Sequence, residues 1–155
     1  SQNMGVFYPL QTFSKAKKVS FKDVPIFVES ESSNVEKVLM KMAKAISNNV
    51  KRINSEERKA LHVAAVFASN FSNHMLTIAR EIAKQNDLDF NVLKPLIAET
   101  LNKSLELGPE KSQTGPAVRG DFEILERHME FLKESPELAE IYRIVSQHII
   151  DSSDQ

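Results

Sequence analysis

The sequence predicts a mainly α protein in which an all-helical part follows a short strand–helix–strand piece. Three observations predict this class. The stretch from Ser55 to Lys84 contains no Pro or Gly, which is typical of one long helix. Before residue 54, short apolar runs bounded by Pro, Ser and Asn are typical of strands. From residue 85 onward, apolar residues recur with helical spacing only.

The first part of the chain is expected to combine strands with one helix. Its second and third strands flank that helix, an order typical of a parallel α/β unit with a right-handed crossover. Pro9 should end the first strand, because proline cannot donate to a sheet ladder. The expected elements are a strand over Gly5–Leu10, a polar loop over 11–23, a strand over Val24–Glu29, a helix over about Val35–Ile46 and a short strand over Val50–Ile53.

The long helix has recognisable ends. Ser55 is its expected N-cap, and Glu56 and Glu57 suit the positive end of the helix dipole. Asn86, just beyond Lys84, suits a left-handed stop. Apolar residues cover most of the circumference, so we expect this helix to lie in the core rather than on the surface.

Polar residues on the long helix form the first candidate site. Four of them fall on nearly one line when each residue advances by about 100°. These are His62, Ser69, Asn73 and Thr77, with Asn70 beside the line and His74 further round. Each buried polar group without a partner costs about 1–3 kcal/mol. The line therefore faces either a partner helix or wet groove that satisfies it, or a ligand in a cleft.

Three further helices are expected after the long one. A Gly- and Pro-rich loop separates the first of them from the other two. Asp89, Asp121 and Ser135 are the expected N-caps, the last followed by Pro at the first helical position. The helices should span about Phe90–Leu105, Asp121–Glu134 and Pro136–Ile150, with the loop over Leu107–Gly120.

The loop Gln113–Asp121 is the second candidate site. Gly115 and Gly120 leave its backbone free, and Arg119 lies just before a helix N-terminus, where amide groups favour anions. Thr114, Arg119 and the following amides would together suit an anionic ligand. In the alternative, Arg119 pairs with Asp121 or a neighbouring helix and the loop only turns the chain.

The composition bounds the function classes. The chain has 155 residues, 41% of them hydrophobic, and a net charge of −1, which does not favour a nucleic-acid partner. It has no Cys, which excludes disulfides and thiol nucleophiles and fits a reducing compartment. No apolar run approaches the roughly 18 residues that span a bilayer. We therefore expect a cytoplasmic protein without membrane contact.

Several familiar chemical motifs are absent. The sequence contains no P-loop, no G-x-S-x-G and no G-x-G-x-x-G. His62 and His74 do not have the spacing of a metal-binding helix, so no metal site is expected. His128 and His148 are single helical histidines, which are usually surface or satisfied residues.

The segments GVFYPLQTFSK, ALHVAAVFASNFSNHM, DFNVLKPLIAET and QTGPAVRGD together resemble the bacterial family of Rossmann-like proteins that carry a C-terminal domain of unknown function. That family is akin to pyrroline-5-carboxylate reductases and β-hydroxyacid dehydrogenases. The resemblance runs from Gly5 to near the C-terminus. It implies that residues 1–54 are the C-terminal remnant of a Rossmann-like NAD(P)-binding domain. Residues 55–155 would then be a helical substrate-binding and dimerisation domain like the C-terminal domain of 6-phosphogluconate dehydrogenase.

The resemblance also assigns roles. It puts the polar residues of the long helix at the cleft of the enzyme, and a strand end near the nicotinamide. The implied catalytic residues are His62, Asn70, Asn73 and His74, the implied substrate-binding residues Ser69, Thr77, Thr114 and Arg119, and the implied cofactor-binding residues Tyr8, Pro9 and Gln11. The chain departs from the related dehydrogenases in one respect, because their Lys followed four residues later by Asn is missing here. His62 and His74 remain as proton donors, since histidine exchanges protons near neutral pH.

The expected function is that of the substrate-binding and dimerisation portion of an NAD(P)-dependent oxidoreductase acting on a small, anionic metabolite. We expect the sequence to be a fragment, with NADP or NAD bound only by the full-length protein. A homodimer is expected because three shorter helices cannot easily cover a long apolar one. The alternative is a non-catalytic helical module that dimerises and binds a ligand, and a purely structural bundle explains the polar residues least well.

Overall fold

The computed structural model describes residues 4–13 and 18–153 and divides the chain into two compact units, residues 1–75 and 76–155. Residues 14–17 of the expected polar loop lie outside the described residues. Helices dominate both the long central stretch and the second unit, and the only sheet of the described residues has three strands. The expected mainly α class is confirmed.

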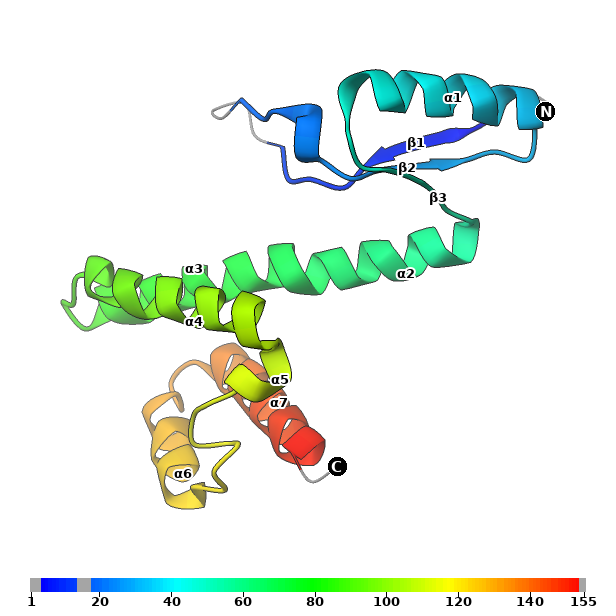
Figure 1. Cartoon of the computed structure of the whole chain (residues 1–155). Helices are drawn as coiled ribbons and strands as arrows, with labels where there is room; N and C mark the ends of the chain where they lie inside the picture. The colour runs from blue at the N-terminus through cyan, green and yellow to red at the C-terminus, as the bar shows by residue number, and fades with distance from the viewer. Residues whose placement is uncertain (1–3, 14–17, 154–155) are drawn as a thin grey trace. The chain divides into compact units, whose positions relative to one another are not determined.

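The first unit is built on that sheet, with the strand order β1-β2-β3. β1 (Val6–Pro9) pairs antiparallel with β2 (Ile26–Glu29), and β2 pairs parallel with β3 (Val50–Arg52). The parallel pair is joined through α1 (Ser33–Ile46), as expected, and a single 3₁₀ turn, η1 (Phe21–Asp23), precedes β2. The antiparallel pairing of β1 was not foreseen. Figure 1 shows α1 on one side of the sheet and the start of the long helix on the other.

The core of the first unit lies between α1 and the sheet. Ile26, Val28 and Ala43 are buried there, with partly buried hydrophobic residues of β1 and α1 against them. The buried hydroxyl of Ser47 donates to the Val24 carbonyl at 2.6 Å and accepts from the Asn49 amide at 3.0 Å. These two bonds fix the end of α1 against the sheet.

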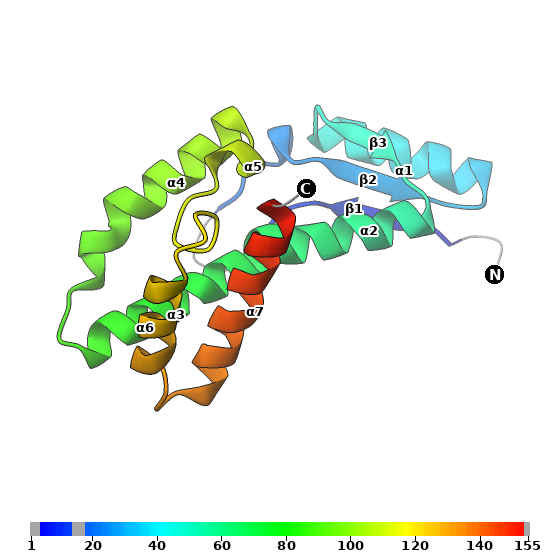
Figure 2. The ribbon, with the colours of Figure 1, turned by 90° about the horizontal axis from the view of Figure 1, so that it is seen from below.

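The long helix is continuous over residues 55–85, but its middle is not α-helical. α2 (Ser55–Ala65) is followed by a π-helical segment, η2 (Val66–Phe71), which we call the π-turn, and then by α3 (Ser72–Gln85). Figure 2 shows α2 running on into α3 without a break. The N-cap is Asn54 rather than Ser55, in a capping box with Glu57. Beyond the helix, Asp87 rather than Asn86 adopts the left-handed conformation, with φ of 55°.

In the described part of the second unit, helices and the loops between them are the elements of the fold. Asp89 and Asp121 cap helices as expected, and Pro95 lies in the first turn of its helix. Five details differ from the expectation. The first helix starts as a 3₁₀ turn and ends two residues late, and the loop contains a short helix. The helix after Asp121 ends three residues early, and the last helix ends three residues late. The elements after α3 are η3 (Phe90–Leu93), α4 (Lys94–Leu107), α5 (Pro109–Ser112), α6 (Phe122–Phe131) and α7 (Pro136–Ser153).

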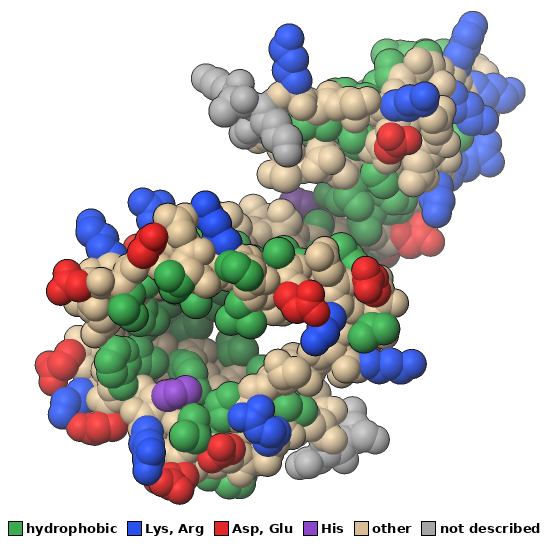
Figure 3. Space-filling view, turned by 60° about the vertical axis from the view of Figure 1, so that its left-hand side comes forward, with side chains coloured by type: hydrophobic (Ala, Val, Ile, Leu, Met, Phe, Trp, Pro, Cys, Tyr) green, Lys and Arg blue, Asp and Glu red, His purple; other side chains and the backbone are tan. Residues whose placement is uncertain are grey.

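The long helix is not buried in this chain, contrary to expectation. No residue of α2 or the π-turn is buried, and on α3 only Ala83 is. Exposed apolar side chains are also frequent on α4, where Leu105 is 86% exposed, and green side chains are prominent in Figure 3. No helix of the described part of the chain has both the length and the apolarity to cross a membrane.

Gly5, just before β1, lies close to α1. A Cβ there would lie 2.6 Å from Leu39 Cδ1 and 3.1 Å from both the Glu29 carbonyl oxygen and Val35 Cγ1. Gly5→Ala should therefore lower the free energy of unfolding by about 1–3 kcal/mol through overpacking. Urea denaturation measures the loss. Because Leu39→Ala removes the closest atom, the double variant should lose less than the sum of the single variants, and simple additivity would contradict the steric cause.

Candidate functional site

Tyr8 and His62 lie against each other in the first unit. Tyr8 is at the end of β1 and His62 is on α2, and the Tyr8 hydroxyl lies 3.2 Å from His62 Nδ1. The two rings meet edge to face, with centroids 6.3 Å apart, and Tyr8 also contacts Phe27 of β2. The structure thus brings together one residue expected at the cofactor and one expected in catalysis.

The side chains of this pair are chemically suited to proton exchange. Imidazole and phenol can each donate or accept a hydrogen bond, and the tautomer of His62 decides which does so here. With Nδ1 engaged by Tyr8, Nε2 remains to face a ligand from the exposed side chain of His62. A histidine oriented in this way through one nitrogen is suited to act as a general acid or base through the other.

A second set of contacts ties the start of α2 to β2. The Glu29 carboxylate accepts a hydrogen bond from the Ser55 hydroxyl and pairs with Arg58 Nε at 2.7 Å. The Ser55 hydrogen bond first, and then Arg58, lower the pKa of Glu29 below its ordinary value. Because Glu29 holds α2 one and two turns before His62, it positions that histidine relative to Tyr8.

The π-turn rearranges the polar residues of the long helix. A π-turn accommodates about one extra residue, so residues after Phe71 are set back by about 100° around the axis relative to a continuous α-helix. The Ser72 hydroxyl donates to the Phe67 carbonyl, five residues earlier, at 3.1 Å. This hydrogen bond supports the wider turn.

The expected line through His62, Ser69 and Asn73 is therefore wrong. The setback moves Ser69 and Asn73 roughly 70° away from His62. It brings Asn70 and His74 to within about 30° of His62, although a continuous α-helix would spread these three over about 120°. All five side chains are exposed, and Thr77 follows on α3 in the second unit.

The other residues expected near the cofactor lie at the same strand end as Tyr8. Pro9 is the last residue of β1 and is half-buried. Gln11 follows in an exposed segment, where its side-chain oxygen accepts from the Thr12 amide at 2.8 Å. Neither Pro9 nor Gln11 forms a hydrogen bond or a ring contact with His62.

The loop after α5 presents Thr114 and Arg119 at the surface of the second unit. Buried Ala117 anchors the loop, and the Asp121 amide donates to the Pro116 carbonyl at 2.9 Å. The alternative pairing of Arg119 with Asp121 is not formed. The Asp121 carboxylate instead accepts from the Ile124 amide and caps α6, and among the described residues Arg119 has no ion-pair partner.

Two features were missed by the sequence analysis. His128 Nδ1 and the Tyr142 hydroxyl lie 2.7 Å apart between α6 and α7 and form a second His–Tyr pair, which no local sequence pattern predicts.

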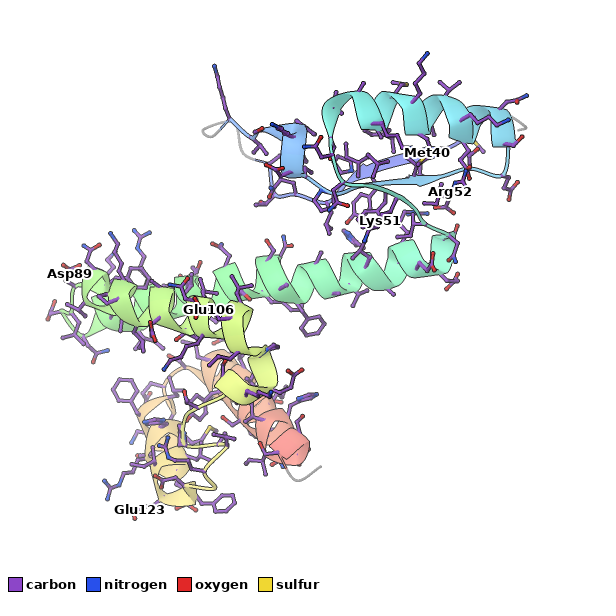
Figure 4. All side chains as sticks on the ribbon, in the orientation of Figure 1. Met40, Lys51, Arg52, Asp89, Glu106 and Glu123 are labelled. Atoms are coloured by element: carbon purple, nitrogen blue, oxygen red, sulfur yellow. The ribbon has the colours of Figure 1, made fainter. Side chains whose placement is uncertain are left out.

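A shallow basic depression of about 530 Å³ is lined by Lys37, Met40, Lys41, Lys44, Ala45 and Arg52. Figure 4 labels Met40 and Arg52, on α1 and β3. Helical spacing of the lysines was the available signal for this depression.

No metal centre is evident in the described part of the chain, where no three His, Asp or Glu residues converge in a way that could hold an ion. Each unit thus offers its own candidate: the His–Tyr pair with the neighbouring polar residues of the long helix in the first unit, and the Thr114–Arg119 loop in the second. A βαβ piece followed by helices, with polar groups at a strand end, is an arrangement found among nucleotide-linked enzymes.

The chain belongs to the family described as "Domain of unknown function (DUF2520)", whose model matches residues 24–149. A comparison with curated proteins finds no match. Two solved structures are similar to the chain. The first is the proposed NADP oxidoreductase BF3122 from Bacteroides fragilis, 44% identical over 95% of this chain, with a TM-score of 0.89.

The second similar structure is protein TM1727 from Thermotoga maritima, 23% identical over 99% of this chain, with a TM-score of 0.78. At that identity the likeness concerns the fold alone. This chain covers 57% of the Bacteroides structure and 63% of the Thermotoga structure, so it spans less than two thirds of either relative.

The Glu29 contacts generate a pH dependence. A lowered pKa in the folded state means that the contribution of Glu29 to stability is present above its ordinary value of 4.5 and is lost as the pH falls below it. Urea denaturation between pH 7 and pH 3 should show this loss in the native chain and a flatter profile in Glu29→Gln. Glu31→Gln is the matched control, because the Glu31 carboxylate makes no ion pair within the described part of the chain. Equal profiles for all three proteins would contradict the assignment.

Proposed function

We propose that this chain is the substrate-binding and dimer-forming portion of an NADP(H)-dependent oxidoreductase acting on a small, anionic metabolite. The observation that carries the proposal is the contact of Tyr8 with His62 at 3.2 Å. It joins the strand end expected near the nicotinamide to the helix expected to line the cleft. The likeness to the proposed NADP oxidoreductase of Bacteroides fragilis supports the cofactor class.

In this proposal the chain meets only the nicotinamide end of the cofactor. Tyr8 and Pro9 are half-buried at the carboxyl end of β1, and they fit a flat ring. The sequence has no Gly-rich phosphate-binding turn, so the cofactor phosphates would be held by residues outside it. Residues 1–54 are then the end of a Rossmann-like domain, and 55–155 a helical domain of the 6-phosphogluconate dehydrogenase C-terminal type.

The remaining roles follow from the positions of the side chains. The bound nicotinamide would supply or accept a hydride. His62, oriented by Tyr8, holds or moves the proton that accompanies it, and Asn70 and His74 lie on the same side of the helix to orient the substrate. Ser69, Asn73 and Thr77 offer further hydrogen bonds. In the second unit, Arg119 and Thr114 would bind an anionic group, which is supported by the lack of an ion-pair partner for Arg119 among the described residues.

A homodimer is part of the same proposal. The chain exposes 12,266 Å², whereas two separate compact units of half its mass would together expose roughly 9,500 Å². The surplus is well above the roughly 800 Å² that each partner buries in a standard interface. Strongly exposed apolar side chains on the helices, such as Leu105, supply the surface to be covered.

Cofactor binding tests the enzymatic part. The full-length protein should bind NADPH in a fluorescence titration, and the 155-residue chain alone should not. Tyr8→Ala should raise the NADPH dissociation constant about tenfold, equivalent to about 1.4 kcal/mol, because the ring contact is lost. Tyr142→Ala removes the tyrosine of the second His–Tyr pair and should leave binding within twofold.

The same titration with NADH distinguishes the two cofactors. A full-length protein that binds neither NADPH nor NADH would overturn the oxidoreductase proposal in favour of the non-catalytic binding module. If the chain is that binding module, His62→Ala and Asn73→Ala should still alter ligand binding or dimer stability.

Sedimentation tests the dimer. The chain should sediment with twice the mass of one copy at micromolar concentration. Leu105→Glu on α4 should raise the dimer dissociation constant at least tenfold, because it would bury a charge. Val38→Glu, at a less exposed but still solvated position on α1 and outside the helical domain, should leave it unchanged. A compact monomer would refute the dimer.

A further inference from the structure

The long helix carries a straight row of large apolar side chains across the π-turn, which we call the apolar ridge. Its members are spaced by four residues and lie in the first unit. They are Val63, Phe67, Phe71 and Met75, which are 56%, 64%, 49% and 40% exposed. The rings of Phe67 and Phe71 meet edge to face with centroids 5.0 Å apart. Charged residues are absent from the ridge.

The π-turn makes this ridge straight. In a continuous α-helix, four residues spaced by four would wind through about 120°. The setback of about 100° within Val66–Phe71 cancels most of that rotation, so the four side chains stay within about 40° of one another. A helix therefore gains a straight apolar edge that an ordinary α-helix with this sequence would lack.

A row of small side chains runs beside the ridge, and we call it the small-residue groove. All its members are exposed and lie on the next sector of the helix. They are Ala60, Ala64, Ala68 and Ser72. A ridge of large residues beside a groove of small ones is self-complementary, because the ridge of one helix can pack into the groove of an identical helix.

We propose that the apolar ridge is the site where two copies of this chain meet, with their long helices antiparallel and the twofold axis passing at the level of Ser69. This rests on the homodimer proposed above. The ridge is nearly palindromic about that level, with two Phe in the middle and an aliphatic residue at each end. A twofold axis there sets Phe67 against the partner's Phe71, and Val63 against the partner's Met75.

The choice of a second copy as the occupant follows from area and charge. The exposed surface of the chain exceeds that of two separate compact units by more than a standard dimer interface requires. An uncharged ridge creates no repulsion between identical copies. Two such helices in contact also cluster four aromatic rings, an arrangement that stabilises interfaces beyond the area that it buries.

Cysteine cross-linking tests the register, and the native chain has no Cys to interfere. Val63→Cys and Met75→Cys are made as separate proteins and oxidised alone and as a mixture. Residues 63 and 63 of two antiparallel copies would lie about 18 Å apart along the axis, too far for a disulfide. The mixture should give a covalent dimer that neither variant gives alone.

The control uses the opposite side of the helix at the same level. Ala65→Cys and Asn73→Cys are also symmetric about Ser69, but they lie about 180° from the ridge and should not cross-link when mixed. Sedimentation of each sample separates the two proposals. A dimer by mass without the 63–75 cross-link overturns the ridge and leaves the homodimer standing.

The other outcomes also decide. Cross-linking of Val63→Cys with itself would indicate parallel helices and overturn the antiparallel arrangement. A monomer would remove both proposals, with the second unit or the rest of a longer protein as the cover of the ridge. Phe67→Glu, checked for native helix content by circular dichroism, should raise the dimer dissociation constant more than tenfold, whereas Val38→Glu should not.

Discussion

The attachment of the long helix to the sheet is the constraint on which the rest of the first unit depends. The contacts that make it are those of Glu29 with Ser55 and Arg58 and the approach of Tyr8 to His62. The Asn54–Glu57 capping box fixes where the helix begins. Together they fix both the direction of α2 and its rotation about its own axis. The attachment therefore sets the direction in which each later side chain of the helix points, up to the π-turn. The π-turn shifts that direction by about 100° around the helix axis.

Much of the fold was predictable because its signals are local. Asp89, Asp121 and Pro136 announce helix starts, and the parallel β2–β3 pair follows from a strand–helix–strand order. The antiparallel pairing of β1 was not predictable, since it depends on contacts between residues some twenty apart. The π-turn was not predictable either. No residue type in Val66–Phe71 marks it, and a period of about 100° per residue does not distinguish it from a continuous α-helix.

The expectation of a buried long helix was wrong for a different reason. Apolar residues around a helix show that the helix avoids water, but they do not show which molecule covers it. In this chain the described helices leave the ridge and much of α4 open. The sequence pattern therefore predicted that the apolar side chains are to be covered, but it did not identify the surface that covers them. The same limit applies to Arg119, because its lack of an ion-pair partner among the described residues suits an anion but does not identify one.

The candidate site was predictable in part. The family resemblance placed Tyr8 and His62 near one ligand, and the structure brings them to hydrogen-bond distance. The spacing of His62, Ser69 and Asn73 predicted a common line on the helix, which the π-turn breaks. That same turn sorts the helix into two neighbouring sectors. His62, Asn70 and His74 occupy one, and the apolar ridge lies about 100° further round. In a continuous α-helix each set would spread over about 120° and the two would intermix. A single backbone irregularity thus separates a polar side of the helix from an apolar side. Any change in the π-turn would disturb both together.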